Sequence, residues 1–454
     1  MAKNQTQDMT VGSPTRLILG FALPMLLGML FQQFYNMVDA IVVGKWIGTE
    51  ALAGVGSTGS INFLILGLCN GIGSGFAIPV AQRFGAKDFE SLRRYVANAL
   101  WASMIIVVPV TVLVSIFCKP ILVLMQTPAD VFDYAYGYIF LVFVGIPIAY
   151  AYNILASILR ALGDSRSPVI FLVVAAALNI VLDIVAVAVL HMGVEGPALA
   201  TVISQAVAAL LCFLYIRKKF TILRISKEEW AFDPRRIATL VSIGLPMGLQ
   251  YSVTAIGSVV LQWSVNGLGT QYVAAMSAGG KVYQFFAIVF DSLGITMSTY
   301  AGQNTGCGKL KRIDRGLFSA MVIASIYSVL SLIVLSFFGQ NIAMIFLDAD
   351  ETAILSDVGY LLVVQSAFYV LLAVVNNFRF TIQGMGFSLL SIVSGFLEMV
   401  ARAGVGFGFV GMFGFKAACF ASPLAWVLAS AFLIPAYFLC RSRLKRMLGA
   451  GDAV

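Results

Sequence analysis

Two aspartates lie inside hydrophobic stretches that are long enough to cross a lipid bilayer. Asp39 belongs to the apolar segment 17–45 and Asp183 to the segment 168–190. An ionised carboxylate in the hydrocarbon core costs about 2.5–3.5 kcal/mol on insertion scales, so such a group faces the protein interior rather than lipid. There it can bind a cation or a proton. Both aspartates are therefore candidates for coupling an ion to a conformational change.

Asn179 and Thr201 are expected to lie beside the two aspartates. At 1.5 Å per residue, Asp39 and Asp183 each lie about 10 Å from one and the same membrane face, and Thr201 lies about 6 Å from it. Asn179 precedes Asp183 by one helical turn and shares its face. Two carboxylates, an amide oxygen and a hydroxyl suit either Na⁺, bound by Asp39, Asn179 and Asp183, or trapped protons. A purely structural role, with each carboxylate satisfied by neighbouring polar groups, is the third interpretation.

Pro24 interrupts the first hydrophobic stretch fifteen residues before Asp39. Proline removes one backbone donor and crowds the preceding turn, so we expect a kink and a hinge at this position. Side chains downstream of it, Gln33, Tyr35 and Met37, are of types that repack around varied apolar ligands. They are candidates for a substrate cavity, with ordinary helix packing as the alternative.

Three more charged residues fall inside apolar stretches of the second half of the chain. Asp291 lies in 274–301 and is interpreted as a substrate contact, a water-lining group or a carboxylate satisfied by a neighbour. Glu398 and Arg402 lie in 388–410 at the i, i+4 spacing of an intrahelical ion pair. A structural pair is favoured there, with a place in the substrate cavity as the alternative.

The composition identifies an integral membrane protein. Hydrophobic residues make up 60% of the 454 positions and charged residues 11%, and the mean hydropathy is +0.94. Soluble chains carry about 25% charged residues. No removable signal peptide is recognised. Hydropathy predicts twelve helical spans, at 17–45, 53–81, 94–117, 134–158, 168–190, 197–216, 237–266, 274–301, 317–338, 357–380, 388–410 and 417–440.

The net charge of +8 reports topology rather than a nucleic-acid partner. Of the 29 Lys and Arg residues, 24 fall on the side that holds both termini, four fall on the other side, and Arg402 lies within a span. The positive-inside rule places both termini in the cytoplasm. This count includes Arg379, at the end of the span 357–380, among the charges of the cytoplasmic loop that follows the span.

No motif for enzymatic chemistry or a cofactor is recognised. The six cysteines and the single histidine show no metal-ligand spacing, and no Walker motif, catalytic triad or HExxH is present. The small residues of 66–75 (LGLCNGIGSG) predict close helix packing rather than a phosphate loop. We expect a protein that is not an enzyme, has no cofactor, and takes its energy from an ion gradient.

The chain repeats itself at an offset near 222 residues. FALPMLLG (21–28) aligns with IGLPMGLQ (243–250), GTEALAGVG (48–56) with GTQYVAAMS (269–277), and GYI (137–139) with GYL (359–361). Six spans per copy make the repeats parallel, as in many transporters. The expected organisation is an N-lobe at 1–216, a cytoplasmic linker at 217–236, a C-lobe at 237–440 and a cytoplasmic tail at 441–454. The acids of the first copy have no acidic counterpart in the second.

Across its length the chain resembles the multidrug and toxic compound extrusion (MATE) transporters. The resemblance rests on Pro24 and Asp39, on ALAGVG (51–56), on LNIVLD (178–183) and on GQN (302–304). The order Asn179, Asp183, Thr201 is similar to the cation or proton site of the bacterial DinF-like branch. The resemblance implies a V-shaped, all-α membrane protein whose twelve helices form two six-helix bundles related by a pseudo-twofold axis.

The resemblance also implies efflux of amphipathic, often cationic, compounds in exchange for H⁺ or Na⁺ by alternating access. Protonation at Asp39 would bend the first span at Pro24. We expect a monomer in the cytoplasmic membrane of a bacterium. The alternative function is a lipid or lipid-linked oligosaccharide flippase of the same superfamily, which would need a basic cavity, whereas only Arg402 is predicted within a span.

Overall fold

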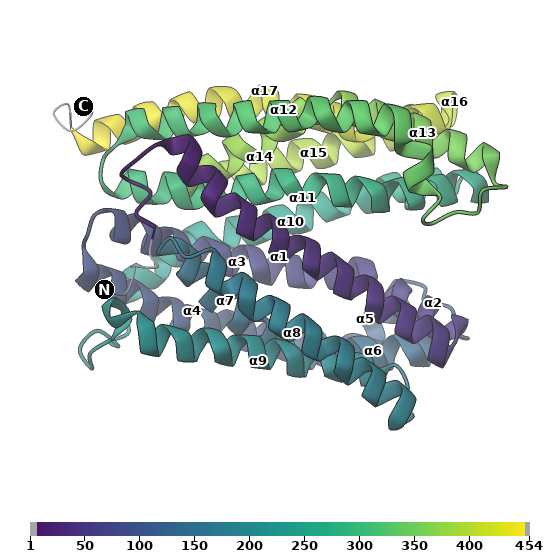
Figure 1. Cartoon of the computed structure of the whole chain (residues 1–454), viewed down its shortest axis with the longest axis horizontal. Coiled ribbons are helices and arrows are strands. Elements are labelled where there is room, and N and C mark those ends of the chain that lie inside the picture. Colours follow the sequence, from purple (N-terminus) through teal and green to yellow (C-terminus); the bar gives the residue numbers. More distant parts are fainter. Residues whose placement is uncertain (1–6, 450–454) are drawn as a thin grey trace. The chain divides into compact units, whose positions relative to one another are not determined.

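The structure is a computed structural model that describes residues 7–449, and these residues form helices and turns without any strand (Figure 1). Residues 1–6 and 450–454, which belong to the expected N-lobe and tail, lie outside the described residues. Ten helices are long and apolar enough to cross a membrane. Two further pairs of helices, bent by 47° and 51°, bring the number of spans to as many as twelve. The prediction of an all-helical polytopic chain is confirmed.

Contacts divide the chain into two compact units. The first comprises Leu23–Gly248 and the segment that ends at Asp8, and the second comprises Met9–Ala22 and the chain from Leu249 onward. Helix α1 (Pro14–Val42) and helix α10 (Pro234–Asn266) therefore each contribute to both units. The other elements of the first unit are η1 (Val43–Ile47), α2 (Thr49–Ser57), α3 (Gly59–Gly85), α4 (Phe89–Ile116), α5 (Cys118–Leu124), α6 (Phe132–Val144), α7 (Ile146–Ala161), α8 (Arg166–Ile184), η2 (Val185–Val189), α9 (Glu195–Lys219) and η3 (Thr221–Leu223).

The second unit repeats this plan with fewer breaks. Its remaining elements are α11 (Thr270–Gly306), α12 (Leu310–Ala343), α13 (Thr352–Ala367), α14 (Tyr369–Gly384), α15 (Leu389–Gly408), α16 (Val410–Phe413) and α17 (Phe415–Leu448). The bent pairs α6–α7 and α13–α14 fall at matching places in the two copies. Glycines with positive φ also recur, at Gly48 and Gly269 and again at Gly163 and Gly386. The two copies therefore share their turns as well as their helices.

The units differ from the expected lobes by two exchanged segments. Residues 9–22 group with the second unit, and residues 234–248 group with the first. Each exchange ends beside the proline of its helix, between Ala22 and Pro24 in α1 and between Pro246 and Leu249 in α10. Both helices keep helical conformation through the proline. The expected kink at Pro24 is thus not accompanied by a break in the helix.

The segment before α1 is held by the GQN motif of α11. The backbone N–H of Met9 donates to Oε1 of Gln303 at 2.9 Å, and Nδ2 of Asn304 donates to the carbonyl of Met9 at 3.2 Å. The guanidinium of Arg312 donates to the same carbonyl at 3.2 Å. Met9 itself is fully buried. This motif therefore anchors the segment that leads into α1 within the second unit.

In the first unit, α10 packs on α3 through glycines. A Cβ added to Gly71 would lie 2.6 Å from the Cα of Gly248, and one added to Gly75 would lie 2.4 Å from the Cα of Gly244. Both helices thus present glycines four residues apart, the spacing that lets two backbones approach closely. The prediction of close packing by 66–75 is confirmed. Because the obstructing atoms belong to backbone, no side-chain rearrangement can make room.

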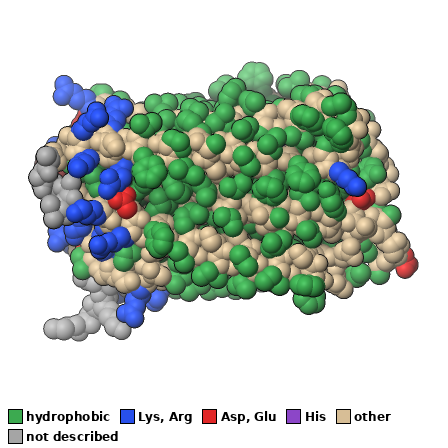
Figure 2. All heavy atoms as spheres, turned by 90° about the horizontal axis from the view of Figure 1, so that it is seen from above, with side chains coloured by type: hydrophobic (Ala, Val, Ile, Leu, Met, Phe, Trp, Pro, Cys, Tyr) green, Lys and Arg blue, Asp and Glu red, His purple; other side chains and the backbone are tan. Residues whose placement is uncertain are grey.

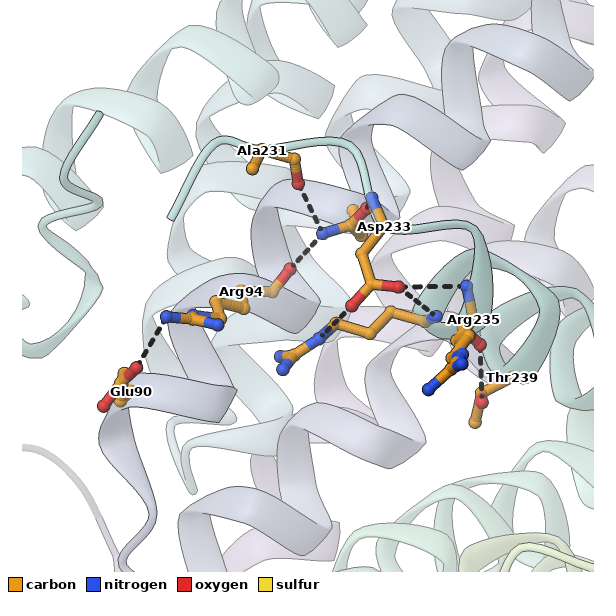
Figure 3. A network of polar contacts seen from close by, with 8 residues as sticks. Glu90, Arg94, Ala231, Asp233, Arg235 and Thr239 are labelled. Atoms are coloured by element: carbon orange, nitrogen blue, oxygen red, sulfur yellow. Dashed lines mark hydrogen bonds and ion pairs between the residues drawn. The ribbon is translucent and has the colours of Figure 1, made fainter. Parts of the chain in front are cut away.

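The expected linker packs on the first unit (Figure 3). In α4, Nδ2 of Asn98 donates to a linker carbonyl at 3.2 Å, and its Oδ1 accepts from the N–H of Asp233 at 2.8 Å. Arg93 forms an ion pair with Glu229 at 2.7 Å. The hydrogen bond from the Arg236 side chain lowers the pKa of Asp233, whose carboxylate also accepts backbone N–H groups at the start of α10. The linker is therefore a bound segment of this unit.

The helix surfaces suit a lipid environment. On the face seen in Figure 2, hydrophobic side chains cover the length of the helices, and Lys and Arg side chains gather towards one end of them. Large apolar side chains are exposed in both units, among them Ile116 at 67%, Phe337 at 76% and Leu439 at 71%. Apolar surface of this extent is stable in contact with acyl chains rather than water.

Substitution of Gly75 by leucine is expected to destabilise the first unit by about 1–3 kcal/mol, the usual cost of overpacking a close contact. Thermal unfolding of the purified protein in detergent measures this as a lower midpoint. Gly280→Leu is the matched control, because a Cβ at this helical glycine meets no atom within 4 Å. Equal midpoints for the two variants would contradict the close packing of α3 and α10.

Candidate functional site

Three helices of the first unit bring the predicted polar residues together. Asp39 comes from α1, Asn179 and Asp183 from α8, and Thr201 from α9. The carboxyl group of Asp39 lies within hydrogen-bonding reach of the side chains of Asp183 and Thr201. Nδ2 of Asn179 donates to Oγ1 of Thr201 at 3.4 Å. Asn179 and Asp183 are almost wholly buried, and Asp39 is half-buried.

The site is rich in acceptors that lack donors. Within the described residues, both carboxylate oxygens of Asp183 and the Oδ1 atoms of Asp39 and Asn179 are buried and accept no hydrogen bond from a protein donor. Two ionised carboxylates offer acceptors only, so a direct contact between them leaves both unsatisfied and mutually repelling. A proton shared between the two groups, or a bound cation, removes this conflict. The geometry therefore suits a site that takes up positive charge.

Two tyrosines border the acid pair. The hydroxyl of Tyr35 lies near the side chains of Gln32 and Gln205. It is also close enough to Asp39 to interact with it electrostatically. Tyr138, from α6, is close enough to Asp39 and Asp183 to interact electrostatically with both. Tyr35 thus lies near the acid pair, and its place in a substrate cavity stays a prediction.

Tyr138 was not predicted as a site residue. It lies in the repeated GYI segment, and its counterpart in the second copy is Tyr360. No residue pattern in the sequence singles it out, because a residue retained in both copies can serve helix packing or a site equally well.

The backbone is irregular next to both aspartates. The π-helical turn η1 begins four residues after Asp39, and η2 begins two residues after Asp183. The two turns contact each other, and η1 also contacts α2. Their buried Val43 joins Ala51 and Val194 in a small apolar cluster against which Tyr138 packs. In the described part of the second copy, α10 and α15 end without a π-helical turn.

Such turns are rare and are found frequently at functional sites, because they displace the side chains that follow them. The sequence analysis did not anticipate them, since no residue type marks a π-helical turn. The two π-helical turns and the break between α2 and α3 are places where the helices of the first copy differ from those of the second. The two turns lie next to the acid pair.

The second unit contains a buried charged cluster of its own. Arg379 of α14 forms a close ion pair with Glu398 of α15, and Arg402 contacts the other oxygen of Glu398 at 3.4 Å. The i, i+4 pair between Glu398 and Arg402 is thus present, but Glu398 has a second and closer partner. The placement of Arg379 in a loop is wrong: it lies within α14 and is only 5% exposed. Hydropathy ended the span at the charge, whereas an ion pair keeps the helix buried beyond it.

The remaining candidates are more dispersed. Asp291 lies half-buried on α11, in the electrostatic range of Arg379. Gln33 accepts a hydrogen bond from Asn36 at 3.4 Å, and Met37 is 38% exposed. The described residues include no group of three or more His, Cys, Asp or Glu side chains placed to hold a metal ion.

The MatE family model matches the chain twice, over residues 24–185 and 246–407. Both matches begin at the proline of a helix that contributes to both units, and they are offset by 222 residues. The internal duplication read from the sequence is therefore confirmed. The matched segments cover well over half of the chain.

Two curated relatives illustrate the range of similar proteins. A probable multidrug resistance protein, YoeA of Bacillus subtilis, is 30% identical over 356 residues and covers 76% of each chain. A protein of Shewanella oneidensis named as an FAD transporter is 25% identical, over 73% of this chain and 74% of its own.

A solved structure shares the fold along the whole chain. It is described as an outward-facing conformation of a multidrug resistance MATE family transporter of the MOP superfamily, and it matches with a TM-score of 0.91 at 23% identity. The alignment covers 98% of this chain and 99% of that structure. With the repeated family match and the relatives, this likeness leads to one conclusion: the chain belongs to the MatE family of multidrug and toxic compound extrusion transporters.

Proposed function

We propose that this multi-pass membrane transporter is a proton-coupled antiporter that exports amphipathic organic compounds. The observation that carries the proposal is the direct approach of the Asp39 and Asp183 carboxyl groups, with acceptors left unsatisfied around them. A proton between two carboxyls satisfies this contact without further ligands. Na⁺ requires a shell of several oxygens at longer distances and is the second candidate.

In the proposed cycle, the acid pair takes up a proton from the outer side and releases it to the cytoplasm, in exchange for cargo moving outward. Movement of one charge through 100 mV supplies about 2.3 kcal/mol, which is enough for appreciable uphill transport. Asn179 and Thr201 would hold the pair in register from α8 and α9, while Tyr35 and Tyr138 would limit access of water. Such a cycle requires both termini in the cytoplasm of a bacterial cell, as the charge distribution predicts.

The prolines supply a mechanical basis for alternating access. Each lies where its helix passes from one compact unit to the other, and each lacks one backbone hydrogen bond. A helix is more easily bent at such a point than elsewhere. Protonation of Asp39, 15 residues from Pro24, would change the packing of α1 on α8. This would change the bend of α1 at Pro24.

The cargo class rests on the relatives. Several are named as multidrug resistance or multidrug export proteins, and one is named as an FAD transporter. An organic cargo is common to these names, whereas a cationic charge is not. The flippase alternative was disfavoured because only Arg402 was expected within a span, and the buried Arg379 weakens that argument.

Replacement of Asp39 by asparagine is expected to abolish gradient-driven transport. An amide cannot exchange a proton with Asp183, so a pH gradient imposed on proteoliposomes should drive ethidium transport in the wild type and at least tenfold more slowly in Asp39→Asn. Asp133→Asn is the matched control, because Asp133 is an exposed aspartate at the start of α6. A sodium gradient alone should drive no transport. Wild-type rates in Asp39→Asn would refute the coupling role.

Replacement of Pro24 by alanine is expected to slow the same transport severalfold while leaving the protein folded. Alanine restores the missing backbone hydrogen bond and stiffens α1 at the boundary between the units. Pro109→Ala is the control, since Pro109 lies inside α4, away from any such boundary. The hinge assignment fails if both variants transport at the same rate, or if only Pro109→Ala is slow.

A further inference from the structure

Helix α15 carries its polar residues on the face that is turned into the second unit. Ser391, Ser394, Glu398 and Arg402 recur at intervals of three or four residues, and each is at most 7% exposed. The opposite face exposes large apolar side chains, namely Val393, Phe396 and Val400. This is the arrangement of a helix with lipid outside and a polar seam inside. Every charge in that seam needs a partner within the protein or from a ligand.

Arg379 has the partners that it needs. Its Nε donates to Oγ of Ser394 at 3.0 Å, and its Nη2 forms the close ion pair with Oε1 of Glu398. Arg379 and Glu398 therefore form a neutral, hydrogen-bonded pair across α14 and α15. A pair of this kind is costly to separate inside a membrane protein, because either charge would then be left alone.

Arg402 is less well satisfied. Its Nη2 reaches Oε2 of Glu398 at 3.4 Å, whereas charge-assisted N–H···O contacts are usually about 2.7–2.9 Å. Its Nη1 is buried and has no hydrogen-bond partner within the described residues. A guanidinium carries five donors in a planar fork that suits a carboxylate or phosphate. One edge of a fully buried cation is thus left without an acceptor.

The other charged and aromatic groups around Arg402 do not fill this role. Asp291 on α11 interacts electrostatically with Arg379. Tyr283 of α11 lies in the electrostatic range of Arg402, Glu398 and Asp291, and its ring stacks on Trp426 at a centroid distance of 6.1 Å. A flat aromatic ring that bears an acidic group can stack on aromatic side chains and pair its acidic group with a cation. Both kinds of partner lie near each other here.

We propose that Arg402 recognises an acidic group, a phosphate monoester or a carboxylate, on an aromatic amphipathic cargo, while Arg379 retains Glu398 as its counter-ion. The assignment of the acidic group to a transported cargo rests on the proposed function. The anion site itself does not depend on it. The acidic group would accept from the vacant edge of Arg402 and complete its coordination. The first unit would then supply the proton site, and the second unit the contact that selects the cargo.

Flavin mononucleotide and riboflavin form a matched pair of probes, since they share one fluorescent ring system and differ by a phosphate monoester. Binding is measured by fluorescence anisotropy to the full-length protein in phosphatidylcholine nanodiscs. The wild type should bind flavin mononucleotide at least tenfold more tightly than riboflavin. Arg402→Gln should lose about tenfold in affinity for flavin mononucleotide and none for riboflavin, because hydrogen bonds to charged groups are strong when desolvated.

Three further variants make the result specific. Arg402→Lys keeps the charge but not the planar fork and should fall between the wild type and Arg402→Gln. Glu398→Gln removes the competing carboxylate and should tighten binding of flavin mononucleotide severalfold. Arg160→Gln is the matched control, since this arginine of the first unit donates to Ser157 at 2.6 Å and forms no ion pair among residues 7–449. A cooperative thermal unfolding transition establishes that each variant is folded, and Glu398→Gln is expected to unfold at a lower temperature because it removes the carboxylate partner of two buried arginines.

Two outcomes would overturn the proposal: equal affinity for the two flavins, or an unchanged affinity in Arg402→Gln. Addition of phosphatidylglycerol to the nanodiscs separates the sources of the phosphate. Competition by this lipid that disappears in Arg402→Gln would retain the anion site but assign it to a lipid headgroup instead of a soluble cargo. Failure of proton-driven ethidium transport in the wild type would refute the antiporter and leave the flavin result standing, so the two proposals fail separately.

Discussion

The approach of two carboxyl groups inside an apolar bundle is the constraint on which the first unit depends. Asp39 and Asp183 cannot both be ionised and face each other without a positive charge between them. Asp183 is fully buried, and Tyr138 lies near both carboxyl groups. The stability of this arrangement is therefore tied to what occupies it. Such a dependence on occupancy makes a packed site responsive to an ion.

The two units use charge in opposite ways. In the first, buried acids lack donors, and the backbone beside them departs from α-helical geometry at η1 and η2. In the second, buried arginines share a single closely held carboxylate, and α15 ends without such distortion. Duplication supplied the same helices to both units. Divergence then placed an excess of acceptors in one unit and an excess of donors in the other.

The site could be predicted from the sequence to the extent that depth and face follow from helical geometry. A constant rise per residue brings Asp39, Asp183 and Thr201 to one level, and the i, i+4 relation places Asn179 on the same face. Tyr138 could not be found in this way, since the comparison of repeats assigns any retained residue to the scaffold. The π-helical turns follow from how η1 and η2 pack on each other, which is tertiary information.

Arg379 shows the limit of hydropathy. A guanidinium at the end of an apolar stretch is interpreted as the start of a loop, although Glu398 and Ser394, which lie 19 and 15 positions further along the chain, hold it within the helix. The exchange of residues 9–22 and 234–248 is also invisible in the sequence, since an exchanged helix segment is as apolar as one that stays. Long-range partners decide both cases.

That exchange bears on the origin of the fold. Each compact unit is completed by a short helical segment that leads, in the sequence, into the matched repeat of the other copy. A single ancestral copy would have lacked this segment in its own unit and could have obtained it only from a second molecule, by reciprocal domain swapping. Fusion of two such chains would preserve the swap within one polypeptide.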